Sequence, residues 1–387
     1  MDDEQYRTDV RRFIVEHAPS RPFVDGLRVP SDAGEERAIR DWLAALYASG
    51  HLGGGWPIEW GGDPAHRATH DLILMEELFR ARAYRPLDQV IFAAQAILQF
   101  GTEAQKAEYL LGIRGGRHIW CQLFSEPDAG SDLASLRTRA VPDGDGWVVT
   151  GQKVWSTDAQ WADMGLLLAR TDPNVDRHAG LTAFVVPMSK SGIDVRPIRE
   201  MTGSEEFCEV FLDDVRLGSE HVLGEVNGGW RVITTGLASE RAFVGANAVQ
   251  LAMMFADLVA LAGACRLPDG SVLIEHEDVR LRLADLFTEV EGARLVVVDT
   301  VERILRDEEH ATDGAVAKLV STETYVQLCE AALELLGNTA GLDEGADELV
   351  ERWYAAFLWS RAPTISGGAS EILRGIVGRQ LLGLPRS

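Results

Sequence analysis

The chain has 387 residues and is acidic, with 60 aspartates and glutamates against 37 lysines and arginines and a formal net charge of −23. Its hydrophobic content of 46% is ordinary for a globular protein and suffices for two or three packed layers around a large core. The charge argues against binding to nucleic acid or to an anionic membrane surface, since both require basic faces.

The amino terminus and the cysteines favour a cytoplasmic protein. The first residues, Met-Asp-Asp-Glu-Gln, are charged and lack the apolar core of a signal peptide. No apolar run approaches the length that spans a membrane. Without a Cys-x-x-Cys pair, the scattered cysteines predict reduced, buried thiols and no metal site. They are Cys121, Cys208, Cys265 and Cys329.

The first third of the chain has the spacing of amphipathic helices. Residues 35–50 carry large apolar side chains at helical intervals and stop at Gly50, a good helix terminator. Residues 69–82 and 86–114 continue in this style, so we expect an N-terminal α-helical domain over residues 1–117. The apolar side chains of the first helix are Ile39, Trp42, Leu43, Leu46 and Tyr47.

From residue 118 to residue 222 the pattern changes to short alternating or apolar runs separated by Gly, Pro and Asp. This is typical of an antiparallel sheet or barrel, and it predicts a β domain over residues 118–222. The runs are residues 147–150, 165–169, 182–186 and 209–212.

Long helices return after Gly228-Gly229, which predicts a C-terminal helical bundle over residues 223–387 and an α+β fold class overall. Residues 278–305 carry one apolar stripe at helical spacing. Its members are Val279, Leu283, Leu286 and Val290.

Two segments of the β region carry the most specific signal. Residues 122–132, Gln-Leu-Phe-Ser-Glu-Pro-Asp-Ala-Gly-Ser-Asp, concentrate small residues and hydroxyls at a turn. Residues 151–157, Gly-Gln-Lys-Val-Trp-Ser-Thr, begin a strand after a tight turn. Trp155 and Thr157 are two residues apart and therefore project from one face of that strand, where a planar cofactor could lie.

In this order and spacing the segments resemble the acyl-CoA dehydrogenase superfamily, over nearly the whole chain. The resemblance implies an N-terminal α-helical domain, a central antiparallel β-barrel or sheet and a C-terminal four-helix bundle. It also implies FAD as cofactor, and it points to an actinobacterial steroid-side-chain type. Further matching segments are residues 56–62, 75–78, 207–216, 228–230, 367–372 and 382–385.

The resemblance implies that both segments contact the flavin. Hydroxyl and backbone donors at the ring edges would stabilise the electron-rich reduced flavin. For either segment alone, the alternative is an ordinary Asx- and Ser-rich turn and an ordinary packing tryptophan. The implied cofactor-binding residues are Gln122, Phe124, Ser125, Gly130, Ser131, Trp155 and Thr157, and Ser131 also matches a hydroxyl close to the substrate.

The family places its catalytic carboxylate in one of two positions. The carboxy-terminal position holds Gly367 here, which has no carboxylate, whereas the position after Gly-Gly-Trp holds Glu240. Glu240 lies on the apolar stripe that contains Leu237 and Val244, and burial there would raise its pKa toward that of a general base. The alternative is a surface glutamate or one spent on an ion pair.

The implied reaction is dehydrogenation of an acyl-CoA to the trans-2-enoyl-CoA. Glu240 would remove the α-proton while the β-hydride moves to flavin N5, and the backbone N–H of Gly367 would hold the thioester carbonyl. Arg241 would organise the substrate site, and an electron-transfer flavoprotein or similar acceptor would take the electrons. The competing interpretations are a flavin oxidase or monooxygenase, or a non-catalytic partner subunit.

One part of the family pattern is degraded. Family tetramers bind the ADP half of FAD with a neighbouring subunit, and this chain keeps Arg266 for that role. Pro268 removes an N–H donor there, Ala369 removes a hydroxyl, and Asp269 and Glu334 would repel a diphosphate.

The degraded pattern predicts an α2β2 tetramer with a homologous chain, a homotetramer being the alternative. Small residues on helices 86–100 and 236–256 suggest either a roomy pocket for a bulky acyl group, such as a steroid side chain, or close helix packing.

Overall fold

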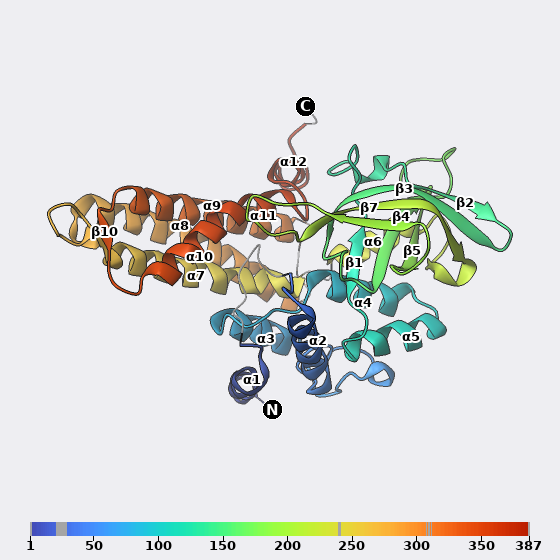
Figure 1. The fold of residues 1–387 in the computed structure, drawn as a ribbon, viewed down its shortest axis with the longest axis horizontal. Helices are drawn as coiled ribbons and strands as arrows, with labels where there is room; N and C mark the ends of the chain where they lie inside the picture. Colours follow the sequence, from blue (N-terminus) through green and yellow to red (C-terminus); the bar gives the residue numbers. More distant parts are fainter. Residues whose placement is uncertain are drawn as a thin grey trace.

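The chain folds into a helical part, a twisted sheet and a long helical bundle (Figure 1). The computed structural model describes residues 2–20, 29–238, 241–306, 308, 310 and 312–385, apart from the side chains of 235–238 and 241–245. Glu240 therefore lies outside the described residues, and so does the side chain of Arg241.

The N-terminal part matches the expected helices, with two differences. The five apolar side chains predicted to face the core from the helix near residues 35–50 are all buried. Residues 86–114 form two helices, because the chain breaks at Gly101 and Thr102 caps the next helix by accepting from the N–H of Gln105. A first helix was not predicted. The helices are α1 (Asp3–His17), α2 (Ala33–Ala48), α3 (Ala68–Arg80), α4 (Asp88–Phe100) and α5 (Glu103–Arg114).

Ion pairs hold α1 against α3. Arg7 Nη1 lies 2.6 Å from Glu77 Oε1, and Arg11 Nε lies 2.7 Å from Glu77 Oε2. Only 3% of the Glu77 side chain is exposed. Burial alone would raise the pKa of this carboxyl, but hydrogen bonds from Arg11 and Arg7 hold it below its usual range. Glu77 is therefore a buried anion neutralised from another helix.

The central part is an eight-stranded sheet in the order β6-β7-β3-β2-β4-β5-β8, with β1 paired to β4. Most pairings are antiparallel, as expected, but β1 runs parallel to β4 and so does one residue pair between β2 and β4. Hairpin connections favour antiparallel pairs, whereas β1 meets a strand about forty residues away. The strands are β1 (Trp120–Leu123), β2 (Arg139–Asp143), β3 (Gly146–Thr157), β4 (Met164–Arg170), β5 (Leu181–Pro187), β6 (Ile193–Pro197), β7 (Phe207–Gly218) and β8 (Val222–Leu223).

The C-terminal helices are α6 (Gly229–Ala238), α7 (Arg241–Ala264), α8 (Glu277–Leu305), α9 (Asp313–Gly337), α10 (Asp347–Trp359), α11 (Arg361–Ile365) and α12 (Ser370–Gln380). Helices α7 to α10 enclose a core of their own, and the predicted stripe of α8 faces it. α6 differs, because its Val232 and Ile233 join the core of the N-terminal helices. The short strands β9 (Cys265–Arg266) and β10 (Gly341–Leu342) pair with each other.

Helix α7 corrects the expectation that no apolar run approaches membrane-spanning length. Its segment Ala246–Ala264 is long and apolar enough to cross a membrane by length and composition. The core helix of a folded domain passes the same test, and α7 packs against α3, α8 and α9 with Leu258 and Leu261 fully buried. The four cysteines are buried and free, as predicted.

Candidate functional site

The structure brings the two β-region segments side by side. The N–H of Val154 donates to the carbonyl of Ser125 at 3.0 Å. The ammonium of Lys153 donates to the carbonyl of Phe124 at 2.9 Å. Segments thirty residues apart in the chain therefore form one surface, with Ser125 adjacent to Trp155.

A buried ion pair lies beneath this surface and was not predicted from the sequence. Lys153 Nζ donates to Glu126 Oε1 at 2.9 Å, and both side chains are almost completely buried. The N–H groups of Arg137 and Thr138 also donate to the Glu126 carboxylate, at 2.6 and 2.8 Å. Burial favours the protonated form of Glu126, but Lys153 and these N–H groups hold its pKa below the usual range.

The same burial lowers the pKa of Lys153 to about 8, while Glu126 opposes that shift. The pair fixes the turn that follows β1 against β3 and the start of β2. Lys153 is one of only four lysines and stands within a segment that the sequence singled out. That scarcity is the signal that could have revealed the pair.

Trp155 is presented outward by a bulge in β3. The pairing with β7 shifts between Lys153 and Ser156, and Trp155 has φ 60°. It is 59% exposed, although Lys153, two residues earlier, is fully buried. Strict alternation would have put both on one face, so the bulge re-aims the ring. The edge of the ring meets Phe207 at a centroid distance of 6.0 Å, perpendicular to it.

Two contacts join this surface to the helices. Phe207 stacks on Trp359, at the end of α10, with ring centroids 5.9 Å apart. Gln89, at the start of α4, donates to the buried carboxylate of Asp158 at 2.6 Å. The sheet, the N-terminal helices and the C-terminal helices therefore meet around Trp155 and Thr157. Neither of these two contacts was predicted, because each depends on long-range packing.

The remaining predicted residues border the same region or the turn after α11. Gln122, Phe124, Ser125 and Thr157 are half-buried, whereas Gly130 and Ser131 are exposed on the loop after β1. Gly367 is exposed, has φ 61° and lies between α11 and α12. Its N–H makes no hydrogen bond to the described part of the chain, and Lys318 Nζ holds the next carbonyl, that of Gly368, at 2.6 Å.

Arg266 lies elsewhere, at the far end of the bundle, and has partners within its own chain. Its Nη2 lies 2.6 Å from Asp343 Oδ2, and its Nη1 donates to the carbonyl of Gly263. Asp269 accepts from the hydroxyl and the N–H of Ser271, and these bonds lower its pKa. Asp269 therefore adds negative charge to the patch.

The surface around Trp155 fits a flavin. An exposed aromatic face, an adjacent turn with backbone and hydroxyl groups, and the open space around Gly130 suit a planar group with polar edges. The residues that would hold its ring are Gln122, Phe124, Ser125, Trp155 and Thr157. In the described part of the chain, no group of three or more His, Cys, Asp or Glu is arranged to hold a metal ion.

Comparison with protein families gives the class directly. Residues 1–117, 121–215 and 227–382 match the N-terminal, middle and C-terminal domains of acyl-CoA dehydrogenases. The chain therefore belongs to the acyl-CoA dehydrogenase family, whose members are FAD-dependent enzymes.

Individual relatives agree with this assignment. Acyl-CoA dehydrogenase IpdE1 of Mycobacterium tuberculosis is 36% identical over 395 residues, which cover 100% of this chain and 98% of IpdE1. Acyl-CoA dehydrogenase FadE34 of the same organism is 38% identical over 346 residues, but these are 88% of this chain and only 46% of the longer FadE34. A solved structure, the Tcur3481-Tcur3483 steroid ACAD, superposes with a TM-score of 0.82 at 30% identity and covers all of both chains.

Proposed function

We propose that the chain is the catalytic subunit of a heteromeric acyl-CoA dehydrogenase that converts a bulky acyl-CoA to its trans-2-enoyl-CoA. The observation that carries this proposal is the outward-facing Trp155 beside Ser125, where the sheet meets both sets of helices. Family membership supports the reaction, and the flavin, when bound, supplies the two-electron acceptor for it.

The chain contributes the proton chemistry and the positioning. Glu240, on the apolar stripe of the sequence, takes the proton from the carbon next to the thioester. The N–H of Gly367 is a donor for the thioester oxygen, and glycine at that position leaves room for a base that arrives from residue 240. Arg241 and Ser131 border the substrate, and the turn at 122–125 orients the ring.

Replacing Glu240 tests this assignment. We expect Glu240→Gln to lower kcat about 10²- to 10⁴-fold, because a general base typically contributes that much, while bound flavin stays unchanged. Glu103→Gln, at a side chain that is 79% exposed on α5, is the matched control and should retain full activity. Unchanged turnover by the Glu240 variant would overturn the assignment, and fast reaction of the reduced flavin with oxygen would favour an oxidase.

The proposed assembly is an α2β2 tetramer in which a homologous chain completes the ADP half of the FAD site. Arg266 is engaged by Asp343 of its own chain, and Asp269 adds negative charge where a diphosphate would lie. The name of the Tcur3481-Tcur3483 steroid ACAD pairs two proteins, and we extend that arrangement to this chain. We place the enzyme in the cytoplasm, with an electron-transfer flavoprotein or similar acceptor as its electron partner.

Flavin stoichiometry tests the assembly. Expressed alone, the chain should retain much less than one FAD per chain, and co-expression with a homologous partner should restore it. Full flavin occupancy in a tetramer of this chain alone would refute the shared site.

A further inference from the structure

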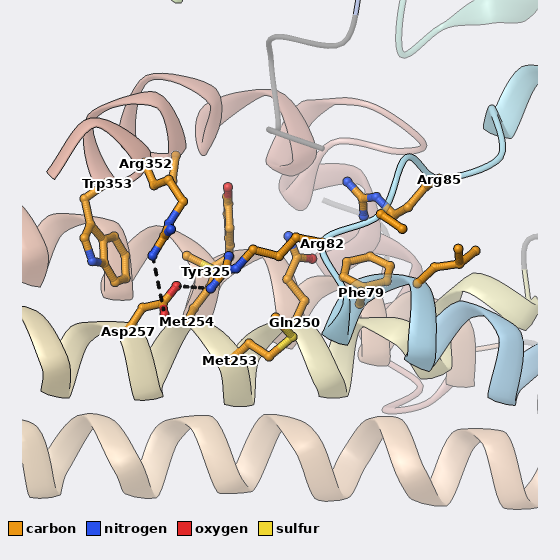
Figure 2. Close-up of a pocket in the computed structure, with 13 residues that line it drawn as sticks. Phe79, Arg82, Arg85, Gln250, Met253, Met254, Asp257, Tyr325, Arg352 and Trp353 are labelled. Carbon is orange, nitrogen blue, oxygen red and sulfur yellow. Dashed lines mark hydrogen bonds and ion pairs between the residues drawn. The ribbon is translucent and has the colours of Figure 1, made fainter. Parts of the chain in front are cut away.

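A small cavity lies where the end of α3 meets α7, α9 and α10 (Figure 2). Its volume is about 100 Å³. An apolar cavity of about 150 Å³ holds a benzene molecule, so this one accommodates only the end of a larger ligand. The apolar side chains of the wall are Leu78, Phe79, Ala83, Met253, Met254, Tyr325, Trp353 and Ala356.

The polar groups of the wall are mainly cationic. Arg82, Arg85 and Arg352 line the cavity together with a single carboxylate, Asp257, in a chain whose net charge is −23. Arg85 lies over the ring of Phe79, with its guanidinium carbon 4.1 Å from the ring centroid. The cavity therefore concentrates positive charge where the protein as a whole has an excess of negative charge.

Asp257 orients two of the guanidiniums toward each other. Its carboxylate accepts from Arg82 Nη2 at 2.6 Å and lies 3.9 Å from Arg352 Nη2, and Figure 2 shows it between them. Each guanidinium has five N–H donors, of which Asp257 occupies some, and Arg352 Nη1 also donates to Glu348 Oε1 at 2.9 Å. The Nε–H of Arg352 is buried and finds no acceptor among the described residues. This donor set suits an oxygen acceptor from a ligand.

The cavity lies further along α7 than the proposed reaction site. Gln250 and Asp257 are nine and sixteen residues after Arg241, which puts them about 14 and 24 Å along the helix. The loop after α3 that bears Arg82 leads into α4, whose Gln89 contacts Asp158 next to Thr157. A long acyl group that is held at the flavin surface and extends along α7 would bring its far end to these arginines.

We infer that the acyl-CoA substrate carries a carbonyl oxygen at its distal end, a ketone or a carboxylate, and that Arg82 and Arg352 bind this oxygen. The inference rests on the proposed function and narrows its substrate class. The apolar body of the acyl group lies against Phe79, Met253 and Met254, and its last few atoms occupy the cavity. A purely apolar tail would leave the buried Nε–H of Arg352 without an acceptor, which disfavours it.

The test compares three thioesters with one carbon skeleton and a distal methyl, ketone or carboxylate, using the FAD-loaded enzyme with its partner chain. Arg82→Gln and Arg352→Gln should each lower kcat/KM about tenfold or more for the two oxygen-bearing thioesters, mainly through KM. The methyl-ended thioester should change by no more than about twofold. Arg80→Gln, at a largely exposed arginine that ends α3 two residues before Arg82, is the matched control.

Lysine variants and inert ligands keep the result interpretable. Arg82→Lys and Arg352→Lys retain the charge beside Asp257 and should lose less than the Gln variants, which a mere folding defect would not produce. Binding of non-oxidisable thioether analogues should show the same preference for distal oxygen. Equal losses for all three thioesters, or no preference in binding, would overturn the inference. Normal binding preference without turnover of any thioester would instead overturn the proposed function.

Discussion

The surface around Trp155 and the patch around Arg266 use their polar groups in opposite ways. At the first, buried polar groups such as Lys153 and Glu126 bond to each other, so the aromatic face of Trp155 and the groups of the adjacent turn stay available to a ligand. At the second, Arg266 pairs with Asp343 and donates to the carbonyl of Gly263, so its guanidinium is bonded within its own chain. In the proposed assembly, this chain keeps the ring half of the FAD site, whereas the patch that would serve a neighbouring chain is engaged within its own chain.

The largest expected effect comes from breaking the support under the first surface. Lys153→Met leaves the Glu126 carboxylate buried without its cation, which should lower the free energy of unfolding by about 3–5 kcal/mol. Chemical denaturation followed by circular dichroism measures it. Lys106→Met, which removes a partly exposed pair with Glu103, should cost no more than about 1 kcal/mol. Equal small losses would show that the buried pair is not what holds the turn.

The response of stability to acid should distinguish the wild-type protein from Lys153→Met. Glu126 binds its proton less tightly in the folded chain than in the unfolded chain, so its stabilising contribution is complete above pH about 4.3 and declines as the pH falls below that value. In Lys153→Met the cation that lowers the pKa of Glu126 is absent, so this pKa should rise, and acid should cost the variant less stability than it costs the wild type. The difference in the free energy of unfolding between the wild type and Lys153→Met should therefore become smaller as the pH falls. A difference that is constant with pH would exclude this coupling.

Removing the exposed ring should weaken flavin binding without unfolding the sheet. Trp155→Ala should weaken FAD binding by about 0.5–1.5 kcal/mol, or up to about tenfold, since the ring is 59% exposed and supports little of the core. Flavin retained after dialysis gives the affinity, and thermal melting checks the fold. Trp155→Phe, which keeps an aromatic face, should recover part of the loss. Unaltered flavin retention by the Ala variant would mean that the flavin ring does not lie against Trp155.

The smallest effect is expected at the other patch. Arg266→Ala removes a half-exposed ion pair with Asp343, so it should cost about 0–1 kcal/mol of stability and leave the flavin content of the assembled enzyme unchanged. Loss of flavin from this variant would show that the patch still binds the cofactor of a neighbouring copy. The contrast between the two regions would then be wrong.

Local patterns were sufficient to predict most elements of the fold. The stripe of α2, the stripe of α8 and the alternating or apolar runs of β3, β4, β5 and β7 lie where the sequence patterns predict. Two features depended on distant partners and escaped prediction. β1 pairs in parallel with β4, and α6 joins the core of the N-terminal helices, because neither pairing is recorded in the local sequence.

For the candidate site too, local patterns were predicted from the sequence, whereas contacts between distant segments were not. The two β-region segments were recognised from their residues, and the structure brings them together through Ser125 and Val154. The bulge that turns Trp155 outward breaks the two-residue period and could not be read from that period. Phe207, Trp359 and Gln89 reach the site only through tertiary packing. Glu240 lies outside the described residues and stays a prediction.

The arginines of α1 give the amino terminus a thermodynamic role. Glu77 sits inside the protein as a carboxylate because Arg7 and Arg11 reach it from the first helix. A proteolytic cut or a shortened expression clone that removed residues 3–17 would take both cations and their helix away from Glu77 and leave Arg80, 3.8 Å away, as its nearby cation. It would also uncover the apolar face of α3 that α1 covers, so truncated versions of this enzyme should be less stable.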